Sequence, residues 1–204
     1  MNSTVFNQIV ERSWLKRPSI EVAPDLIGCK LVRLLPNGQT IRGMIVETEA
    51  YALGDPAFHA YQQRTKRNSV VFGPAGRSYI YLIYGLYHCF NIVTDQEGIP
   101  STVLIRALQI EAEETGMNRC FEVCNRVAAG PGKLCRVMQI DRSLNACILQ
   151  PGQPLWLEHR GSQFQQELER QAITFVQTTR IGLSQGTDLP WRWYVSNCPN
   201  VSRP

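Results

Sequence analysis

The sequence predicts a single α+β domain over residues 1–204, with a curved, mainly antiparallel sheet, surrounding helices and a protruding β-hairpin. Two pairs of strand-like runs are each joined by a tight turn, and further strand-like runs in the last third can close the sheet. A chain of 204 residues should bury about 70% of its unfolded surface as one domain. Neither an internal repeat nor a linker rich in Pro or Gly divides it.

The first 20 residues are expected to hold a short helix, and a β-hairpin follows. Its strands are residues 28–35 and 40–51, and Asn37-Gly38 supplies the positive φ angles that a tight turn needs. The two-residue period of a strand places four residues of the return strand on one face: Ile45, Glu47, Glu49 and Tyr51. Two carboxylates on an otherwise apolar strand are costly to bury unless they have a partner or a task.

The middle of the chain alternates a loop with strands. Residues 52–77 lack clean periodicity and predict a long surface loop, which in compact domains is commonly functional. A second hairpin follows, with strands at residues 78–84 and 86–93, a turn at Gly85 and Tyr84 near its tip. The strand predicted at residues 101–108 is interrupted by Arg106, which must reach solvent or pair with a carboxylate. The obvious partner is Glu49 or Glu47.

The C-terminal part is expected to combine two helices with the remaining strands. Residues 110–129 have a helical pattern, and residues 130–138 look like a new helix. Its start contains Pro131 and Lys133 and could present backbone N–H groups to a phosphate. Runs at residues 155–158, 173–182 and 191–195 predict strands that close the sheet.

The distribution of charge indicates a nucleic-acid partner. The formal net charge is only +4 at pH 7, but no acidic residue occurs between Asp55 and Asp95. The same interval holds these basic residues and tyrosines: Arg64, Lys66, Arg67, Arg77, Tyr61, Tyr79, Tyr81, Tyr84 and Tyr87. Any one tyrosine is more often a core residue than a platform for a base. The absence of acids, however, fits a surface that faces phosphates.

Composition argues against several other classes. Seven cysteines without a Cys-x-x-Cys pair, together with three histidines, argue against a zinc site, and we expect no metal or other cofactor. The first residues show no basic segment followed by an apolar one, and the chain has no run of about 18 apolar residues. We therefore expect a soluble, cytoplasmic protein with reduced thiols and no membrane partner.

Several separated strings match one family in order, from about residue 20 to the C-terminus. They are Ile45-Val-Glu-Thr-Glu-Ala-Tyr51, His59, Tyr79-Ile-Tyr-Leu-Ile-Tyr-Gly-Leu-Tyr-His-Cys-Phe-Asn91, Leu104-Ile-Arg-Ala107 and Gly130-Pro-Gly-Lys-Leu134. With these strings the chain resembles the alkyladenine (3-methyladenine) DNA glycosylases of the mammalian type, also called N-methylpurine DNA glycosylases. The resemblance implies a monofunctional hydrolase that flips alkylated or deaminated purines out of duplex DNA, cleaves the N-glycosidic bond and initiates base excision repair.

The resemblance also implies roles for individual residues. Glu49 is expected to be the general base that activates the attacking water, and Arg106 to hold that carboxylate and the nearby backbone phosphate. The flipped base is expected to stack against three walls, formed by Tyr51, His59 and Tyr81. Asn91 is expected to form the floor of the pocket. Tyr84 is expected to fill the gap left in the duplex. Damaged double-stranded DNA is the implied partner of a monomeric enzyme, in the nucleoid if the source is bacterial and in the nucleus if it is eukaryotic.

Elementary chemistry agrees with these roles. A base inside a duplex cannot be reached, so extrusion must be offset by a wedge and an aromatic pocket. Glycosidic cleavage passes through an oxocarbenium-like state, which a carboxylate near C1′ stabilises while it deprotonates water. Cationic N-alkylated purines gain roughly 0.5 to 2 kcal/mol from electron-rich rings.

Three basic residues of the chain are expected to contact DNA: Arg64, Arg67 and Lys133. Phosphate contact suits Lys133 better than Schiff-base chemistry.

Alternatives remain at this point. His59 can be an ordinary structural histidine, and for Glu47 a structural or solvent-facing acid is the favoured interpretation. A single-strand-binding module would use the same basic and aromatic surface, but it would not need Glu49. A zinc nucleobase deaminase needs His-x-Glu and Pro-Cys-x-x-Cys, and neither string is present. A one-carbon transferase has only fold analogy in its favour. The preferred lesion among 3-methyladenine, 7-methylguanine, hypoxanthine and ethenoadenine stays open.

Overall fold

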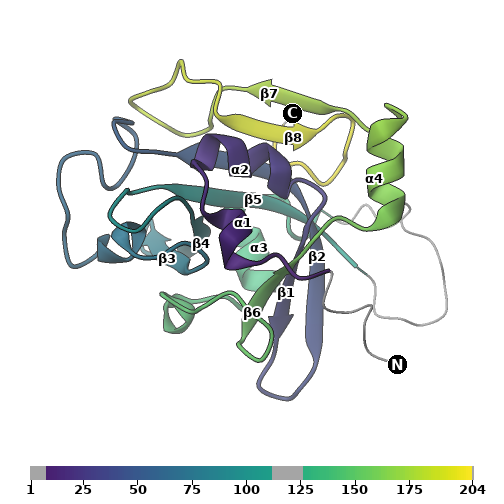
Figure 1. Cartoon of the computed structure of the whole chain (residues 1–204), viewed down its shortest axis with the longest axis horizontal. Helices are drawn as coiled ribbons and strands as arrows, with labels where there is room; N and C mark the ends of the chain where they lie inside the picture. The colour runs from purple at the N-terminus through teal and green to yellow at the C-terminus, as the bar shows by residue number, and fades with distance from the viewer. Residues whose placement is uncertain (1–7, 112–125, 204) are drawn as a thin grey trace.

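The computed structural model describes residues 8–111 and 126–203 (Figure 1). Within these ranges the strands are β1 (Lys30–Leu34), β2 (Thr40–Tyr51), β3 (Ser78–Ile83), β4 (Tyr87–Val93), β5 (Thr102–Ile110), β6 (Leu155–Glu158), β7 (Phe175–Thr178) and β8 (Arg192–Val195). The α-helices are α1 (Arg12–Leu15), α2 (Ser19–Leu26), α3 (Pro131–Val137) and α4 (Ser162–Glu169). Short 3-10 helices lie at Ser69–Phe72 and Arg142–Leu144.

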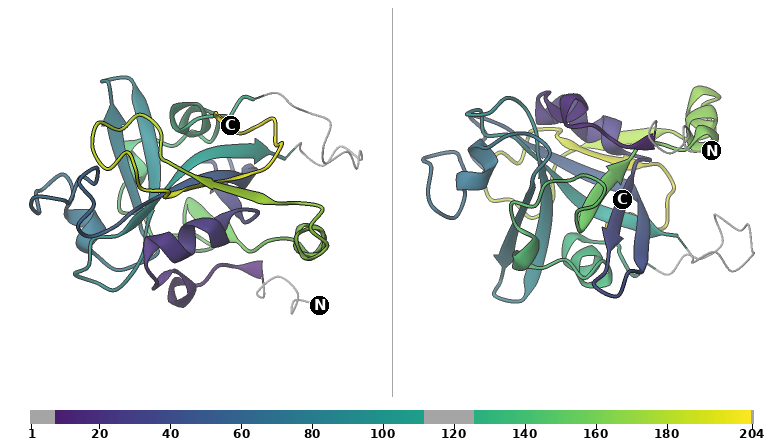
Figure 2. Two further views of the ribbon diagram at one scale, coloured as in Figure 1. Left: turned by 90° about the horizontal axis from the view of Figure 1, so that it is seen from above. Right: turned by 60° about the horizontal axis from the view of Figure 1, so that its bottom comes forward.

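The strands form one curved antiparallel sheet in the order β3-β4-β5-β2-β1-β6. The long strand β2 is its centre, because β5 pairs along one edge while β1 and β8 share the other. β7 extends the sheet beyond β8. The β3–β4 hairpin projects from one end of the sheet (Figure 2), and α1 and α2 lie across the strands (Figure 1). The α+β fold with a curved antiparallel sheet and a protruding hairpin is thus confirmed.

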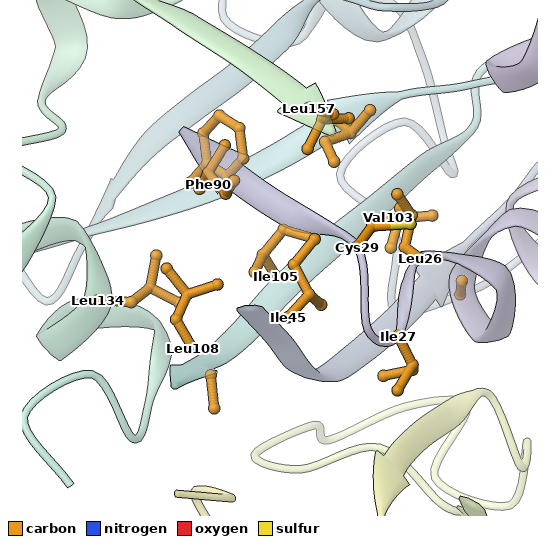
Figure 3. Packing of buried hydrophobic residues seen from close by; sticks show 14 of the residues in the cluster. Leu26, Ile27, Cys29, Ile45, Phe90, Val103, Ile105, Leu108, Leu134 and Leu157 are labelled. Carbon is orange, nitrogen blue, oxygen red and sulfur yellow. The ribbon is translucent and has the colours of Figure 1, made fainter. Parts of the chain in front are cut away.

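Apolar side chains from sheet and helices meet in one core (Figure 3). Fully buried members include Leu26, Ile27, Leu31, Ile45, Phe90, Ile105, Leu134 and Leu157. β5 is buried along most of its length, and each fully buried Leu or Ile contributes roughly 1.5 to 3 kcal/mol relative to an exposed one. Its one charged side chain, Arg106, is held in a buried position by its ion pairs with Glu47 and Glu49 of β2.

Most of the predicted elements are confirmed. Both hairpins form, with positive φ at Gly38 in the first turn and at Tyr84 and Gly85 in the second. The segment between β2 and β3 is irregular apart from the 3-10 helix at Ser69–Phe72. The N-terminal part forms two helices, α1 and α2, instead of one, and α2 extends beyond residue 20.

The C-terminal part of the structure differs from the prediction in one expected helix and one helix that was not expected. The helix expected at residues 110–129 lies mostly outside the described residues, but Ile110 ends β5 and residues 126–129 are not helical. The helix α4 was not predicted. It carries only two apolar residues, Phe164 and Leu168, among polar ones, so its amphipathic signal is weak.

The alternation predicted for β2 also holds only in part. The pairing with β5 shifts register between Ile45 and Glu47 and again between Glu47 and Thr48. Ile45 and Val46 therefore both lie in the apolar core, whereas strict alternation would separate them. Beyond this bulge, Glu47 and Glu49 both contact Arg106, as the period of two requires for side chains on one face.

Candidate active site

A completely buried carboxylate lies at the centre of the sheet. Glu49 accepts hydrogen bonds from three donors that come from different parts of the chain. Its Oε2 accepts from the Tyr51 hydroxyl at 2.8 Å, and its Oε1 accepts from the Ile181 backbone N–H at 2.8 Å. The Arg106 Nη1 lies 3.1 Å from the same Oε1. Charge-assisted hydrogen bonds of this kind fix the orientation of the carboxylate.

The neighbouring acid, Glu47, is equally buried but has different partners. Its Oε1 lies 3.2 Å from Arg106 Nε and 2.7 Å from Arg192 Nη1, and accepts from the Ser202 hydroxyl at 3.0 Å. Its Oε2 accepts from the Ser202 N–H at 2.8 Å. Glu47 thus connects β2 to β8 and to the C-terminal segment, in agreement with a structural acid and not with a solvent-facing one.

A pocket of about 220 Å³ opens beside Tyr51. This volume is somewhat below the roughly 300–1,000 Å³ of ordinary ligand sites, so it suits a small flat ligand. The lining contains all four residues expected to hold a base: Tyr51, His59, Tyr81 and Asn91. Further lining residues are Ala57, Phe58, Arg67, Tyr79, Leu82, Ile83, Thr102, Gly182 and Leu183. Five of these thirteen residues carry aromatic rings.

The aromatic walls have defined contacts. The rings of His59 and Tyr81 meet edge to face with centroids 4.4 Å apart, and those of Tyr79 and Tyr81 lie 5.5 Å apart. His59 Nδ1 is 3.0 Å from the Tyr79 hydroxyl. At the inner end, Asn91 is only 3% exposed, and its Nδ2 donates to the Tyr79 carbonyl oxygen at 3.1 Å. Packing thus holds each ring in one orientation.

Burial determines the protonation of these groups. It raises the pKa of Tyr51 well above the usual value of 10, with the nearby charge of Glu49 as the next cause, so the phenol stays a hydrogen-bond donor. Burial likewise raises the pKa of Tyr79 to about 12 and that of Tyr81 well above 10. Burial and the charge of Arg67 lower the pKa of His59. The imidazole is therefore neutral at physiological pH.

The residues expected to contact DNA lie outside the pocket or at its rim. Tyr84 is 82% exposed at the tip of the β3–β4 hairpin. Arg67 is exposed and belongs to the pocket lining, whereas Arg64 lies over the ring of Phe72 at 5.4 Å. Lys133, in α3, borders a second hollow of about 510 Å³ between α3 and the hairpin.

The segment after β7 contributes residues that the sequence analysis missed. Ile181 bonds to Glu49, Gly182 and Leu183 line the pocket, and the buried Arg180 pairs with Asp55. This segment is far from the matching strings. The strand predicted at residues 173–182 was too long, because β7 ends at Thr178 and residues 179–182 are irregular. The sequence contains two weak signals of this pair. Arg180 stands close to Gly182, and Asp55 is the last acidic residue before the interval 56–94, which has none.

The described part of the chain offers no group of three or more His, Cys, Asp or Glu side chains that could hold a metal ion. Among its residues the free cysteines include Cys29, Cys89, Cys135 and Cys147. Burial raises the pKa of Cys29 to about 11 and also raises that of Cys135, which makes reactive thiolates rare at these positions.

None of the helices within the described ranges is long and apolar enough to cross a membrane.

The fold and the site define the class of protein. A buried carboxylate that is paired with arginine and bonded to Tyr51, a residue of the pocket lining, agrees with what the resemblance to DNA glycosylases implies. A profile of the family described as methylpurine-DNA glycosylase matches residues 13–199. The chain belongs to this family.

Individual relatives agree over almost the whole chain. A protein of Trichodesmium erythraeum is 55% identical over 97% of this chain and 98% of its own length. Another, of Synechococcus sp. (strain JA-3-3Ab), is 50% identical over 93% and 96%, and one of Methanoculleus marisnigri is 42% identical over 94% and 97%. Each is named, as an inferred assignment, a 3-methyladenine DNA glycosylase. The family predicted from the sequence is confirmed.

Proposed function

We propose that the protein is a monofunctional DNA glycosylase that flips an alkylated or deaminated purine out of duplex DNA and hydrolyses its N-glycosidic bond, which initiates base excision repair. The observation that carries the proposal is the position of Glu49, which is completely buried and held by Arg106, by Ile181 and by Tyr51, whose side chain lines the aromatic pocket. A module that only bound single strands would gain nothing from burying a charge there, because burial of a carboxylate costs free energy.

In the proposed reaction, Glu49 is the general base. It accepts a proton from a water molecule while the oxygen of that water attacks C1′ of the deoxyribose. The bond from C1′ to the purine nitrogen breaks, and the base leaves with the bonding electron pair. A carboxylate near C1′ also stabilises the positive charge that develops on the sugar. Arg106 positions the carboxylate, and its remaining donor capacity suits the adjacent phosphate.

The pocket is proposed to receive the flipped base between Tyr51, His59 and Tyr81, with Asn91 at the floor. Stacking of a base on aromatic rings is worth roughly 1 to 3 kcal/mol, which offsets part of the cost of unstacking it from the duplex. Tyr84, exposed at the hairpin tip, is proposed to enter the gap in the duplex. These assignments explain why one hairpin carries both an exposed ring and two of the residues proposed to hold the base, Tyr81 and Asn91.

The proposed partner is double-stranded DNA with a damaged purine, bound by a monomer, so that in the cell the protein is associated with DNA. Arg64, Arg67 and Lys133 are proposed to contact phosphates. The two arginines belong to an interval without acidic residues, so nearby carboxylates do not oppose a polyanion there. Solvent exposure of Arg67 and Lys133 supports this role.

The experiment is to incubate the protein with duplex oligonucleotides that contain 7-methylguanine, 3-methyladenine, hypoxanthine or ethenoadenine. Release of the free base, with a strand that breaks only after alkali, is expected for a monofunctional enzyme. Immediate strand cleavage would assign a lyase step instead, and Lys133→Ala would show whether Lys133 supplies it. Binding without release of any base would refute the proposed function.

A further inference from the structure

A buried ion pair lies beyond the residues to which the proposed reaction assigns a task. Arg180, after β7, and Asp55, in the loop after β2, both have completely buried side chains and share two contacts. One joins Arg180 Nη1 to Asp55 Oδ2, and the other joins Nη2 to Oδ1 at 2.8 Å. Nη1 also donates to the Ala50 carbonyl oxygen at 3.0 Å, and Nη2 to that of Gly186 at 3.2 Å. The Arg180 guanidinium thus bonds to the end of β2, to the loop that follows β2 and to the loop after β7.

The same guanidinium contacts the pocket wall. Its carbon lies 4.6 Å from the ring centroid of Tyr51 and 5.3 Å from that of Trp191. Tyr51 lines the pocket and Arg180 does not, so Arg180 supports the Tyr51 ring from behind. Contacts between Arg and an aromatic ring strengthen when water is excluded, as it is here.

The backbone around Arg180 reaches the carboxylate. The next residue, Ile181, donates its N–H to Glu49 Oε1 at 2.8 Å. The carbonyl of Ala50, held by Arg180, lies between Glu49 and Tyr51 in the chain. Two of the three donors to Glu49 are therefore anchored at Arg180: the Ile181 N–H by peptide connection and the Tyr51 hydroxyl through its supported ring.

We infer that the Arg180–Asp55 pair is a positioning device that fixes the Glu49 carboxylate and the Tyr51 ring relative to the pocket. This inference rests on the proposed function. Arg180 is a positioning residue and not a catalytic one, because it acts through Tyr51 and Ile181. Buried ion pairs contribute little net stability compared with well-packed apolar residues, so stability alone is a weak reason for this one. Displacement of a catalytic group by about 1 Å can cost on the order of 100-fold in rate.

Two substitutions perturb the pair by different means. Arg180→Lys keeps the charge but replaces the forked contact with Asp55 by a single ammonium group. Gly186→Ala keeps both charges and acts by contact, since a Cβ at Gly186 would lie 3.1 Å from both Arg180 Nη2 and Asp55 Oδ1. Its backbone φ of +57° adds strain.

Each substitution has a matched control. Arg160 also bonds to three backbone carbonyl oxygens and lies over an aromatic ring, that of Phe175 at 5.7 Å, but does not line the pocket. Arg160→Lys thus reproduces the chemical change at a structural arginine. Gly152 has a φ of +83°, and a Cβ there would meet no atom within 4 Å, so Gly152→Ala reproduces the backbone strain without the contact.

The experiment compares these four variants with the wild-type chain by single-turnover base release, by affinity for a duplex with an abasic-site analogue, and by Tm. Arg180→Lys and Gly186→Ala are expected to slow base release by about 30- to 100-fold while affinity changes less than about threefold. The controls are expected to lower Tm similarly and to retain the wild-type rate. Equal rates in test and control variants would overturn the inference, as would a loss of affinity that accounts for the slower release. If the wild-type chain released no base, the proposed function would fail first and the inference with it.

Discussion

Replacement of Glu49 by Gln tests the site most directly, because Gln keeps the shape of Glu and removes its negative charge and its capacity to accept a proton. Oε1 accepts from Arg106 and Ile181, and Oε2 accepts from Tyr51. In Gln the NH₂ group can take the place of Oε2 and donate to the Tyr51 hydroxyl oxygen, while the amide oxygen accepts from Arg106 and Ile181. The variant therefore loses chiefly the negative charge and the capacity to take up a proton.

The magnitude follows from these losses. Removal of a general base costs about 10²- to 10⁴-fold in rate. Loss of the anion that stabilises the developing charge on the sugar costs on the order of 10²- to 10³-fold by itself. Because the two effects reside in one group they do not multiply fully, and we expect a loss of at least about 10³-fold, or roughly 4 kcal/mol in the barrier. Stability should fall by only about 1 to 3 kcal/mol, since Arg106 keeps its pairing with Glu47.

The matched control is Glu47→Gln on the same strand. Glu47 joins Arg106, Arg192 and Ser202, so the change leaves buried guanidinium groups poorly compensated. Breaking such a pair costs about 3 to 5 kcal/mol, which for a chain of this size lowers Tm by roughly 6 to 20 °C. Base release per folded molecule should fall far less than in Glu49→Gln. The two acids are thus expected to separate catalysis from stability.

The assay is single-turnover release of hypoxanthine from a duplex at saturating protein, with DNA affinity measured by fluorescence anisotropy and Tm by circular dichroism. Glu49→Gln should bind DNA almost normally and release no measurable base. A rate within threefold of wild type would refute the assignment of Glu49. If a folded Glu47→Gln were the inactive variant instead, the choice between the two acids would be wrong.

Three further changes test the proposed contacts with DNA. Tyr84→Ala should weaken binding to a lesion in duplex DNA more than to the same lesion in a bubble, because only the duplex leaves a gap to fill; equal losses in anisotropy titrations would contradict a wedge. Arg67→Ala should weaken binding to all duplexes alike and reduce the salt slope by about one unit, whereas a loss for one lesion alone would assign Arg67 to base recognition. Asn91→Ser should release guanine faster than wild type and keep most activity on hypoxanthine and ethenoadenine, because the side chain at the pocket floor then no longer excludes the 2-amino group of guanine. Background guanine release with a collapse of hypoxanthine release would instead make Asn91 a positive contact or a structural residue.

Local patterns in the sequence determined the hairpins and the main features of the site. Asn37-Gly38 and Gly85 require turns, and the alternation in the flanking runs requires strands. The lone Arg106 had to reach solvent or pair with a carboxylate, and Glu47 and Glu49 were the two candidates for a partner. The ordered strings between Ile45 and Leu134 were specific enough to predict the family, because several rare strings rarely occur together by chance.

Only the tertiary structure decided which segments surround each of the two acids. A strand period of two places Glu47 and Glu49 on the same face and cannot rank them. Their difference comes from distant segments. Arg192 and Ser202 contact Glu47, whereas Glu49 is bonded to Ile181, 132 residues away, and to Tyr51, which lines the pocket.

The sequence did not predict the bulge at Ile45 or the Arg180–Asp55 pair, and the reason is the same. The bulge depends on the register with β5, and the pair joins the loop after β2 to residues beyond the end of β7, where a strand had been predicted. Local propensity and periodicity determine the secondary structure of a segment and which of its faces is apolar. Which remote segment packs against that face depends on the packing of the whole chain, and that packing brings Arg180 and Ile181 to Tyr51 and Glu49.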